Sequence, residues 1–195
     1  MSIFLGFFLD NKSNNDIASV AENVKEIFDD LGIKVRWSNP CTYHSTLLFL
    51  GKSAFPLKVF IIKNKLKKFQ FKKFKVKFNS VKLGISRQYR ELIFLDFLEG
   101  GEEMRGLYLE LKKIIGDKGD INFIPHLTLG RVNKDLSAQE SANIIKDLTN
   151  VSKKMNVNKI AFEVSEIKLV KSEDGNYSFL LDINTTLQLV SSLFG

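Results

Sequence analysis

The chain has 195 residues, of which 44% are hydrophobic and 26% charged, a composition that supports a folded core and excludes a disordered chain. Its net charge of +7 permits RNA, DNA or a nucleotide as partner without selecting one of them. The single cysteine, Cys41, excludes an intrachain disulfide and a cysteine-built metal site, and no apolar run approaches the roughly 20 residues of a membrane span, so we expect a cytoplasmic protein without a membrane partner.

The first part of the chain alternates between apolar runs that end in turn residues and stretches with apolar residues at helical spacing. Gly32 is placed to end the first such helix. The elements expected here, in chain order, are a strand at 2–10, a helix from a cap at Asn15 or Asp16 to Leu31, strands at 34–37 and 44–50, and a helix that opens at Pro56.

The second part contains a clear strand alternation, with Phe74, Val76 and Phe78 on one face and lysines on the other. Ser137 and Glu140 have the spacing of a capping box. The elements expected here are strands at 69–83 and 91–98 joined by an exposed loop, a helix at 102–115, a strand at 126–132, a helix opened by the capping box, and strands at 161–170 and 177–183 around the turn Asp174-Gly175.

Consecutive pairs of strands interrupted by helices favour an α+β fold over a doubly wound parallel sheet. No Pro-rich or Ser-rich linker interrupts the chain, so residues 1–195 are expected to form a single domain, in which any two lobes share one interface.

Both histidines of the chain are followed by a threonine two positions later, in His44-Ser45-Thr46 and His126-Leu127-Thr128. Residues i and i+2 of a strand point to the same face, so each imidazole has a threonine hydroxyl beside it. A lone strand histidine is usually a structural residue. The matched pair, in two similar apolar strands, favours a function instead, because a buried imidazole without a partner costs stability.

Two histidines and two hydroxyl donors suit a phosphoester. One neutral imidazole can take a proton from a nucleophile while a protonated one gives a proton to the leaving oxygen, and histidine can do both near pH 7. Hydroxyls can donate hydrogen bonds to phosphate oxygens. The chain has no third histidine for a zinc site, and neither motif contains an acidic residue, so we expect no metal and no other cofactor.

These motifs resemble the two-histidine phosphoesterase superfamily, in particular its RNA 2′,3′-cyclic phosphodiesterase or 2′-5′ RNA ligase branch. The residues that carry the resemblance are Trp37, His44-Ser45-Thr46-Leu47-Leu48-Phe49-Leu50-Gly51 and Pro125-His126-Leu127-Thr128-Leu129-Gly130-Arg131, with the strands around Phe4 and at Glu166-Ile167-Lys168-Leu169.

The resemblance implies a duplicated bilobal fold, with two antiparallel sheets facing a central cleft and helices outside. It implies metal-independent hydrolysis of a 2′,3′-cyclic phosphate to a 2′-phosphate, with a 2′-5′ ligation as a further activity. In the family's mechanism His44 is the proton donor and His126 the proton acceptor, and Thr46, Thr128 and Arg131 hold the phosphate. The residues alone assign neither histidine to either role.

Arg131 depends on a local feature of its strand. Strict alternation from His126 and Thr128 turns Arg131 to the opposite face, whereas a bulge at Gly130 turns it into the cleft. Phe4 and three residues of the loop at 84–90, namely Arg87, Tyr89 and Arg90, are candidate RNA contacts, because an aromatic ring can stack on a base and arginines can hold phosphate.

The sequence therefore leaves three candidate functions. The first is an RNA 2′,3′-cyclic phosphodiesterase acting on RNA ends such as tRNA fragments, as a monomer. The second is the same chemistry on a small cyclic nucleotide or a 2′-5′ oligonucleotide. The third is a non-catalytic RNA-binding module, which would not need two proton carriers.

Overall fold

The computed structural model describes residues 1–53, 55–84, 92–117, 122–173 and 175–185. It contains two sheets in which all neighbouring strands are antiparallel. The first sheet has the order β3 (His44–Gly51), β1 (Ser2–Phe8), β8 (Glu166–Glu173) and β9 (Asn176–Asn184). The second has the order β2 (Val35–Trp37), β6 (Leu127–Val132), β5 (Leu92–Glu99), β4 (Phe74–Leu83) and β7 (Ala161–Val164).

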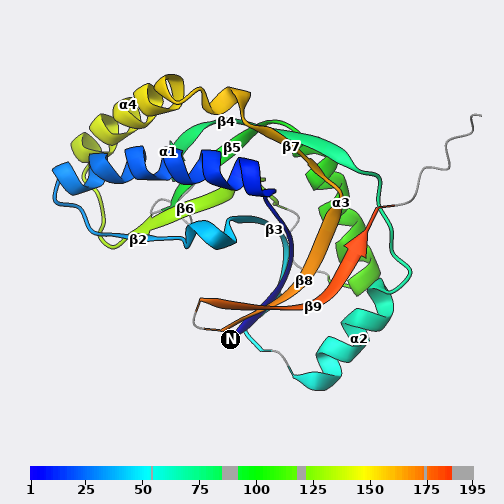
Figure 1. The fold of residues 1–195 in the computed structure, drawn as a ribbon. Helices are drawn as coiled ribbons and strands as arrows, with labels where there is room; N and C mark the ends of the chain where they lie inside the picture. Colours follow the sequence, from blue (N-terminus) through cyan, green and yellow to red (C-terminus); the bar gives the residue numbers. More distant parts are fainter. Residues whose placement is uncertain (54, 85–91, 118–121, 174, 186–195) are drawn as a thin grey trace, which may run out of the picture.

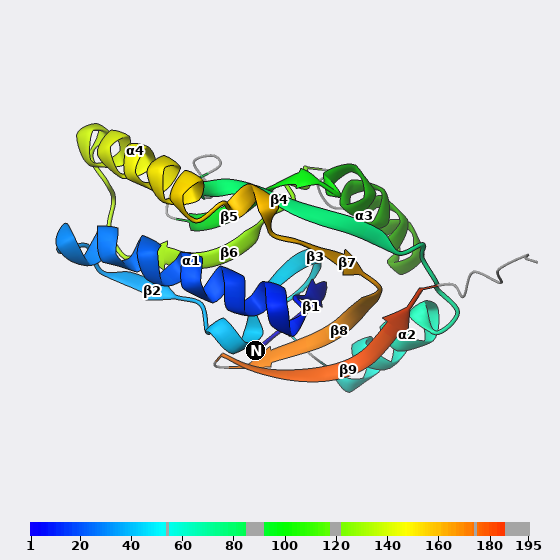
Figure 2. The same cartoon turned by 45° about the horizontal axis from the view of Figure 1, so that its top comes forward.

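Helices lie on the outer sides of both sheets. Figures 1 and 2 show α1 (Asn11–Asp30) and α4 (Ala138–Lys154) beside the second sheet, and α2 (Pro56–Leu66) and α3 (Gly101–Ile115) beside the first. This architecture confirms the predicted α+β fold with two antiparallel sheets.

The chain passes repeatedly between the sheets. After β1 in the first sheet it forms α1 and β2 on the second, returns for β3, and later crosses back for β8 and β9. No contiguous half of the chain therefore builds one sheet by itself. This interleaving favours the single bilobal domain expected from the sequence, which stays a prediction.

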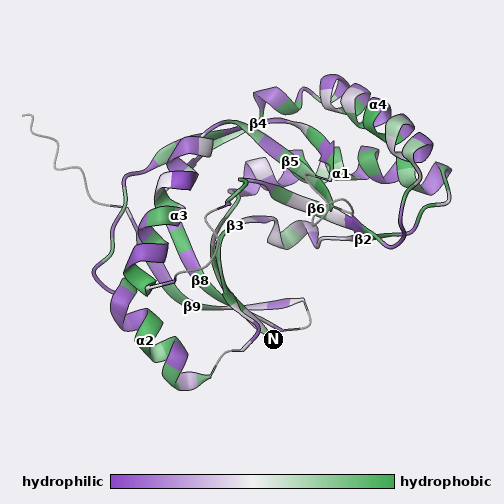
Figure 3. Cartoon of the chain, turned by 180° about the vertical axis from the view of Figure 1, so that it is seen from behind, coloured by the Kyte–Doolittle hydropathy of each residue, from purple (hydrophilic) through white to green (hydrophobic). Residues whose placement is uncertain are grey.

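The core is rich in phenylalanine and joins the two sheets. Phe7 of β1 is fully buried, and its ring lies 6.4 Å from that of Phe74 and 6.0 Å from that of Phe162, both in the second sheet. Burial of such a side chain contributes about 1.5–3 kcal/mol. In Figure 3 the helices α2, α3 and α4 each carry both hydrophilic and hydrophobic residues. This is expected for helices with one face on a sheet and the other toward solvent.

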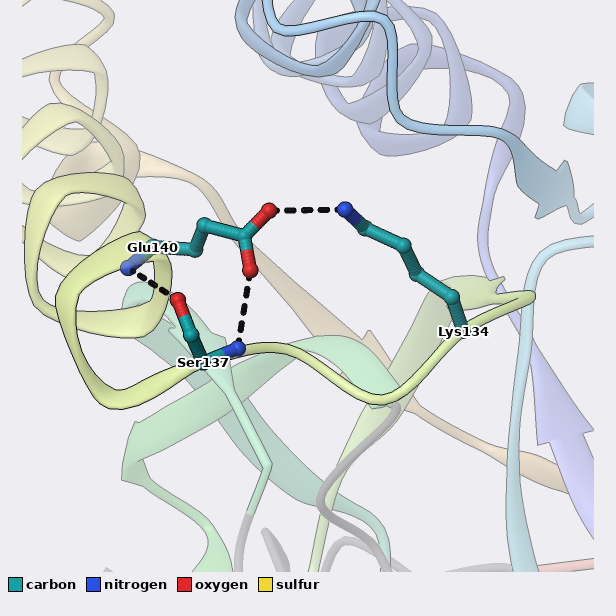
Figure 4. Close-up of polar contacts among 3 residues, drawn as sticks. All are labelled: Lys134, Ser137 and Glu140. Atoms are coloured by element: carbon teal, nitrogen blue, oxygen red, sulfur yellow. Dashed lines mark hydrogen bonds and ion pairs between the residues drawn. The ribbon is translucent and has the colours of Figure 1, made fainter.

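The capping box predicted at the start of α4 is confirmed. Glu140 N–H donates to Ser137 Oγ at 3.2 Å, and Ser137 N–H donates to Glu140 Oε2 at 2.8 Å (Figure 4). Lys134 Nζ donates to Glu140 Oε1 at 2.7 Å. This lysine bond, followed by the bonds to Ser137, lowers the pKa of Glu140 to about 2. The carboxylate therefore stays ionised at the positive end of the helix.

The first helix begins earlier than predicted. The sequence predicts a cap at Asn15 or Asp16, but α1 starts at Asn11. The cap is Asp10, whose Oδ1 accepts a hydrogen bond of 2.7 Å from Ser13 N–H. Ser13 is itself buried, so this first turn packs against the protein in spite of its polar sequence.

The strand predicted at 161–170 is wrong as a single element. The structure has β7 in the second sheet and β8 in the first, with Ser165 between them. Buried residues change parity at this point, from Phe162 and Val164 to Ile167 and Leu169. In addition, β4 begins at Phe74 rather than at residue 69, and of residues 69–73 Phe71 forms one isolated bridge to Thr185.

We expect Phe7→Ala to lower the free energy of unfolding by about 3–5 kcal/mol, because it removes a fully buried ring between the sheets. Urea denaturation followed by circular dichroism measures this. The control is Phe60→Ala on α2, where the ring is 61% exposed and a change within about 0.5 kcal/mol is expected. Equal losses in the two variants would contradict a shared core built around Phe7.

Candidate active site

The two His-x-Thr motifs come from different sheets and meet. His44 and Thr46 lie on β3 of the first sheet, and Thr128 lies on β6 of the second, with His126 directly before that strand. The buried hydroxyl of Ser45 donates a hydrogen bond of 2.8 Å to the main-chain carbonyl of His126. Burial is the main cause that lowers the pKa of His44, and the positive charge of a protonated His126 lowers it further, so the two imidazoles lie within electrostatic reach of each other.

Each imidazole is held in the same way by the chain that precedes it. His44 Nδ1 lies 2.9 Å from the carbonyl oxygen of Thr42, and His126 Nδ1 lies 2.8 Å from that of Ile124. A carbonyl oxygen only accepts hydrogen bonds, so Nδ1 carries the proton in both rings. In a neutral ring whose Nδ1 carries the proton, Nε2 is the acceptor atom.

A β-bulge follows the threonine of each motif. In the pairing of β1 with β3, Gly6 lies opposite Thr46 and Leu5 opposite Leu48, so Leu47 is skipped. In the pairing of β5 with β6, Phe94 lies opposite Thr128 and Ile93 opposite Gly130, so Leu129 is skipped. An extra residue reverses the alternation of the strand beyond it. The third residue after each threonine therefore shares the threonine's face.

This bulge turns Arg131 toward the site. Arg131 lines the same cavity as His44 and Thr128, and its charge lowers the pKa of His126. Gly130 points the other way, since a Cβ built on it would lie 2.9 Å from atoms of the Val35 and Trp37 side chains. The break in alternation that Arg131 required is present, one residue earlier than Gly130.

The cavity has a volume of about 730 Å³. Its wall is formed by the segment from β2 to the 3-10 helix η1 (Pro40–Thr42), the start of β3, part of β6 and the hairpin between β8 and β9. The wall residues are Arg36, Trp37, Ser38, Asn39, Thr42, Tyr43, His44, Thr128, Gly130, Arg131, Gly175, Asn176 and Tyr177. Thr46 and His126 are partly exposed and lie outside this wall.

Aromatic rings surround His44. The Phe4 ring stacks on the imidazole with centroids 4.9 Å apart, and the rings of Phe8 and Tyr177 lie 5.3 Å away. Phe4 is only 5% exposed, so the structure places it behind the imidazole, with little surface left for a base. Tyr177 was missed in the sequence, which predicted its hairpin turn but gave no signal that the hairpin reaches His44.

Burial is the largest influence on both histidines and lowers the pKa of each below 6.5. The main-chain carbonyls that bind Nδ1 oppose this shift, and a neighbouring positive charge adds to it, from His126 in one case and Arg131 in the other. Both rings are therefore mainly neutral at pH 7 in the free protein.

Three predicted RNA contacts, Arg87, Tyr89 and Arg90, lie outside the described residues. Within the described part of the chain no group of three or more His, Cys, Asp or Glu side chains is placed to hold a metal ion. No helix in that part is long and apolar enough to cross a membrane.

Comparison with known proteins identifies related sequences and folds. Residues 44–176 match the family model of the 2′-5′ RNA ligase superfamily. An RNA 2′,3′-cyclic phosphodiesterase of Archaeoglobus fulgidus is 32% identical over 139 residues, covering 69% of this chain and 77% of the relative. A protein of the same description from Aquifex aeolicus is 29% identical over 136 residues, covering 66% and 69%. The crystal structure of E. coli LigT complexed with ATP superposes with a TM-score of 0.60 at 15% identity, covering 95% and 98% of the two chains.

We expect NMR titration to give two histidine transitions, both with midpoints below pH 6.5, because burial disfavours the charged form of each ring. The chain has only two histidines, so both signals can be assigned by substitution. Arg131→Gln should raise the midpoint of His126 more than that of His44, since it removes a positive charge beside His126.

The control for this titration is Arg105→Gln on α3, whose arginine is paired with Glu102 and lies outside the cavity wall. It should move neither midpoint. A midpoint of His126 that is unchanged in Arg131→Gln would show that the guanidinium does not act on this ring.

Proposed function

The chain belongs to the 2′-5′ RNA ligase superfamily, and on this premise we propose that it hydrolyses 2′,3′-cyclic phosphate ends of RNA to 2′-phosphates. The observation that carries the proposal is the pair of imidazoles in one site, each bound through Nδ1 to a main-chain carbonyl, which makes Nε2 the acceptor atom of each neutral ring. A binding module would need neither proton carrier, so this arrangement favours catalysis.

In the proposed reaction a water molecule attacks the phosphorus atom and the bond from phosphorus to O3′ breaks. One histidine, in its neutral form, takes a proton from the water through Nε2, and the other, in its protonated form, gives its Nε2 proton to O3′ as it leaves. The product is a 2′-phosphate with a free 3′-hydroxyl. The hydroxyls of Thr46 and Thr128 donate to the non-bridging oxygens, and Arg131 stabilises the charge that develops on them.

The surroundings of the two histidines support His44 as the acid and His126 as the base. The positive charge that acts on His44 is that of His126, and it is absent when His126 is neutral, as a base must be. The guanidinium of Arg131 acts on His126 and disfavours its protonated form, which suits a base. Burial lowers the pKa of both rings, so the permanent charge of Arg131 beside His126 is what distinguishes the two surroundings.

The size of the cavity favours one alternative substrate. A volume of about 730 Å³ lies within the range of sites for small ligands. A small cyclic nucleotide or a 2′-5′ oligonucleotide is therefore the second candidate, with the same histidine chemistry. Ligation, in which a 5′-hydroxyl rather than water forms the new bond at a 2′,3′-cyclic end, uses the same groups in the same positions.

Three finer parts of the proposal concern the setting of the reaction. We place it in the cytoplasm, on RNA ends such as those of tRNA fragments, with the protein as a monomer. The free thiol of Cys41 is exposed, which suits a reducing compartment. Cell fractionation and light scattering of the purified protein test the compartment and the monomer.

The decisive experiment incubates an RNA with a 2′,3′-cyclic phosphate end in the presence of EDTA and identifies the product. We expect a 2′-phosphate, and a loss of rate of about 100-fold or more in both His44→Ala and His126→Ala, because each removes a proton carrier. Cys41→Ser, a neighbour outside the cavity wall, should keep its activity. Loss of activity in EDTA, or full activity in either histidine variant, would overturn the proposal.

A further test concerns the hydrogen bond that joins the motifs. Ser45→Ala leaves the carbonyl of His126 without this donor, and we expect a loss of about 1–3 kcal/mol in the free energy of unfolding. Because the bond also sets His126 relative to His44, kcat should fall several-fold, by about 1 kcal/mol in activation free energy, with little change in KM.

The matched control is Ser152→Ala on α4. Ser152 is also buried, and its hydroxyl donates to Leu148 O at 2.6 Å and accepts from Val81 N–H at 2.9 Å, away from the cavity. It should lose similar stability without a change in kcat. Equal effects of the two variants on kcat would show that Ser45 acts on stability alone.

A further inference from the structure

Two arginines lie opposite each other on the cavity side of the second sheet. Arg36 of β2 and Arg131 of β6 are direct partners in the antiparallel register, so their side chains leave the sheet on the same face. Their neighbours Trp37 and Gly130 are also partners; the Trp37 ring packs on Phe28 of α1, and a Cβ on Gly130 would point toward the Trp37 side chain. Both arginines line the cavity.

The two paired side chains carry the same charge. Directly opposite residues in such a pair have Cβ atoms about 4.5–5.5 Å apart, and like charges at this separation destabilise a sheet. Arg36 has no carboxylate partner among the residues that the structure describes, and its side chain is exposed to the cavity. The described wall of the cavity contains no Asp or Glu. An anion bound there would remove the repulsion.

The position of Arg36 fits a phosphate other than the one that reacts. Arg131 follows Thr128 on the same strand and the same face, next to the histidines. Arg36 lies one strand further out, because β2 is the edge strand beyond β6. In an RNA that ends in a 2′,3′-cyclic phosphate, the nearest other phosphate is the one on O5′ of the terminal nucleoside.

We propose that Arg36, beside Arg131, forms a second phosphate subsite that takes the phosphate on O5′ of the nucleotide bearing the cyclic phosphate. The inference rests on the proposed function and names its substrate class: a cyclic phosphate end with a second phosphate on its 5′ side. A guanidinium binds such a group through charge-assisted, often bidentate hydrogen bonds. A nucleoside 2′,3′-cyclic phosphate without this group leaves Arg36 unused.

Three substrates test the subsite: a nucleoside 2′,3′-cyclic phosphate, the same compound with a 5′-phosphate, and a dinucleotide that ends in the cyclic phosphate. The second and third distinguish a free 5′-phosphate from the phosphodiester of an RNA chain. For the unmodified protein we expect kcat/KM to be higher with a 5′ phosphate group. In Arg36→Gln the loss for the two-phosphate substrates should exceed the loss for the cyclic mononucleotide by about tenfold or more, as for other charged hydrogen bonds.

Two controls separate the possible failures. Arg105→Gln, outside the cavity wall, should leave the ratios of kcat/KM among the three substrates unchanged. A dinucleotide with a neutral methylphosphonate linkage should remove most of the difference between Arg36→Gln and the unmodified protein. Equal losses on all substrates in Arg36→Gln would overturn the subsite. Absence of turnover on every cyclic phosphate by the unmodified protein would instead overturn the proposed function.

Discussion

The site depends on the contact between two strands that belong to different sheets. The buried hydroxyl of Ser45 donates to the carbonyl of His126, so the first motif is bonded directly to the main chain of the second. Behind this bond, Phe7 packs on Phe74 and Phe162 and holds the two sheets together. The hydrogen bond fixes the orientation of the two strands relative to each other. The apolar contact supplies most of the free energy that holds the two sheets together.

Two structural features that both motifs share then set the orientation of the side chains in the site. The main-chain carbonyl two residues before each histidine selects the tautomer, and the bulge after each threonine sets which later residue joins the face. Both features are provided by the main chain. The backbone therefore orients both halves alike, and the difference between them comes from the side chains added around each histidine.

Much of this could be predicted from the sequence, and the failures have physical causes. The alternation of Phe74, Val76 and Phe78 and the capping box at Ser137 are local patterns, and both were confirmed. The start of α1 was missed because the polar run after Asp10 has the composition of a turn, although Asp10 caps it as a helix. The switch of sheets at Ser165 was visible only as a change in parity of the buried residues. Tyr177 and Arg36 enter the site through tertiary packing and strand register, which no local pattern encodes.

The bulges also explain why the cavity has a charged side. At the position three residues after the threonine, the second motif has Arg131 and the first has Phe49. Phe49 lies opposite Phe4 in the register, is 53% exposed, and contributes to an apolar surface with Phe55 and Leu57 at the start of α2. The two motif strands thus have the same backbone irregularity, but β6 presents the cation of Arg131 where β3 presents the ring of Phe49. The positive charge of the cavity wall therefore lies on the side of β6 and β2, where Arg131 and Arg36 are found.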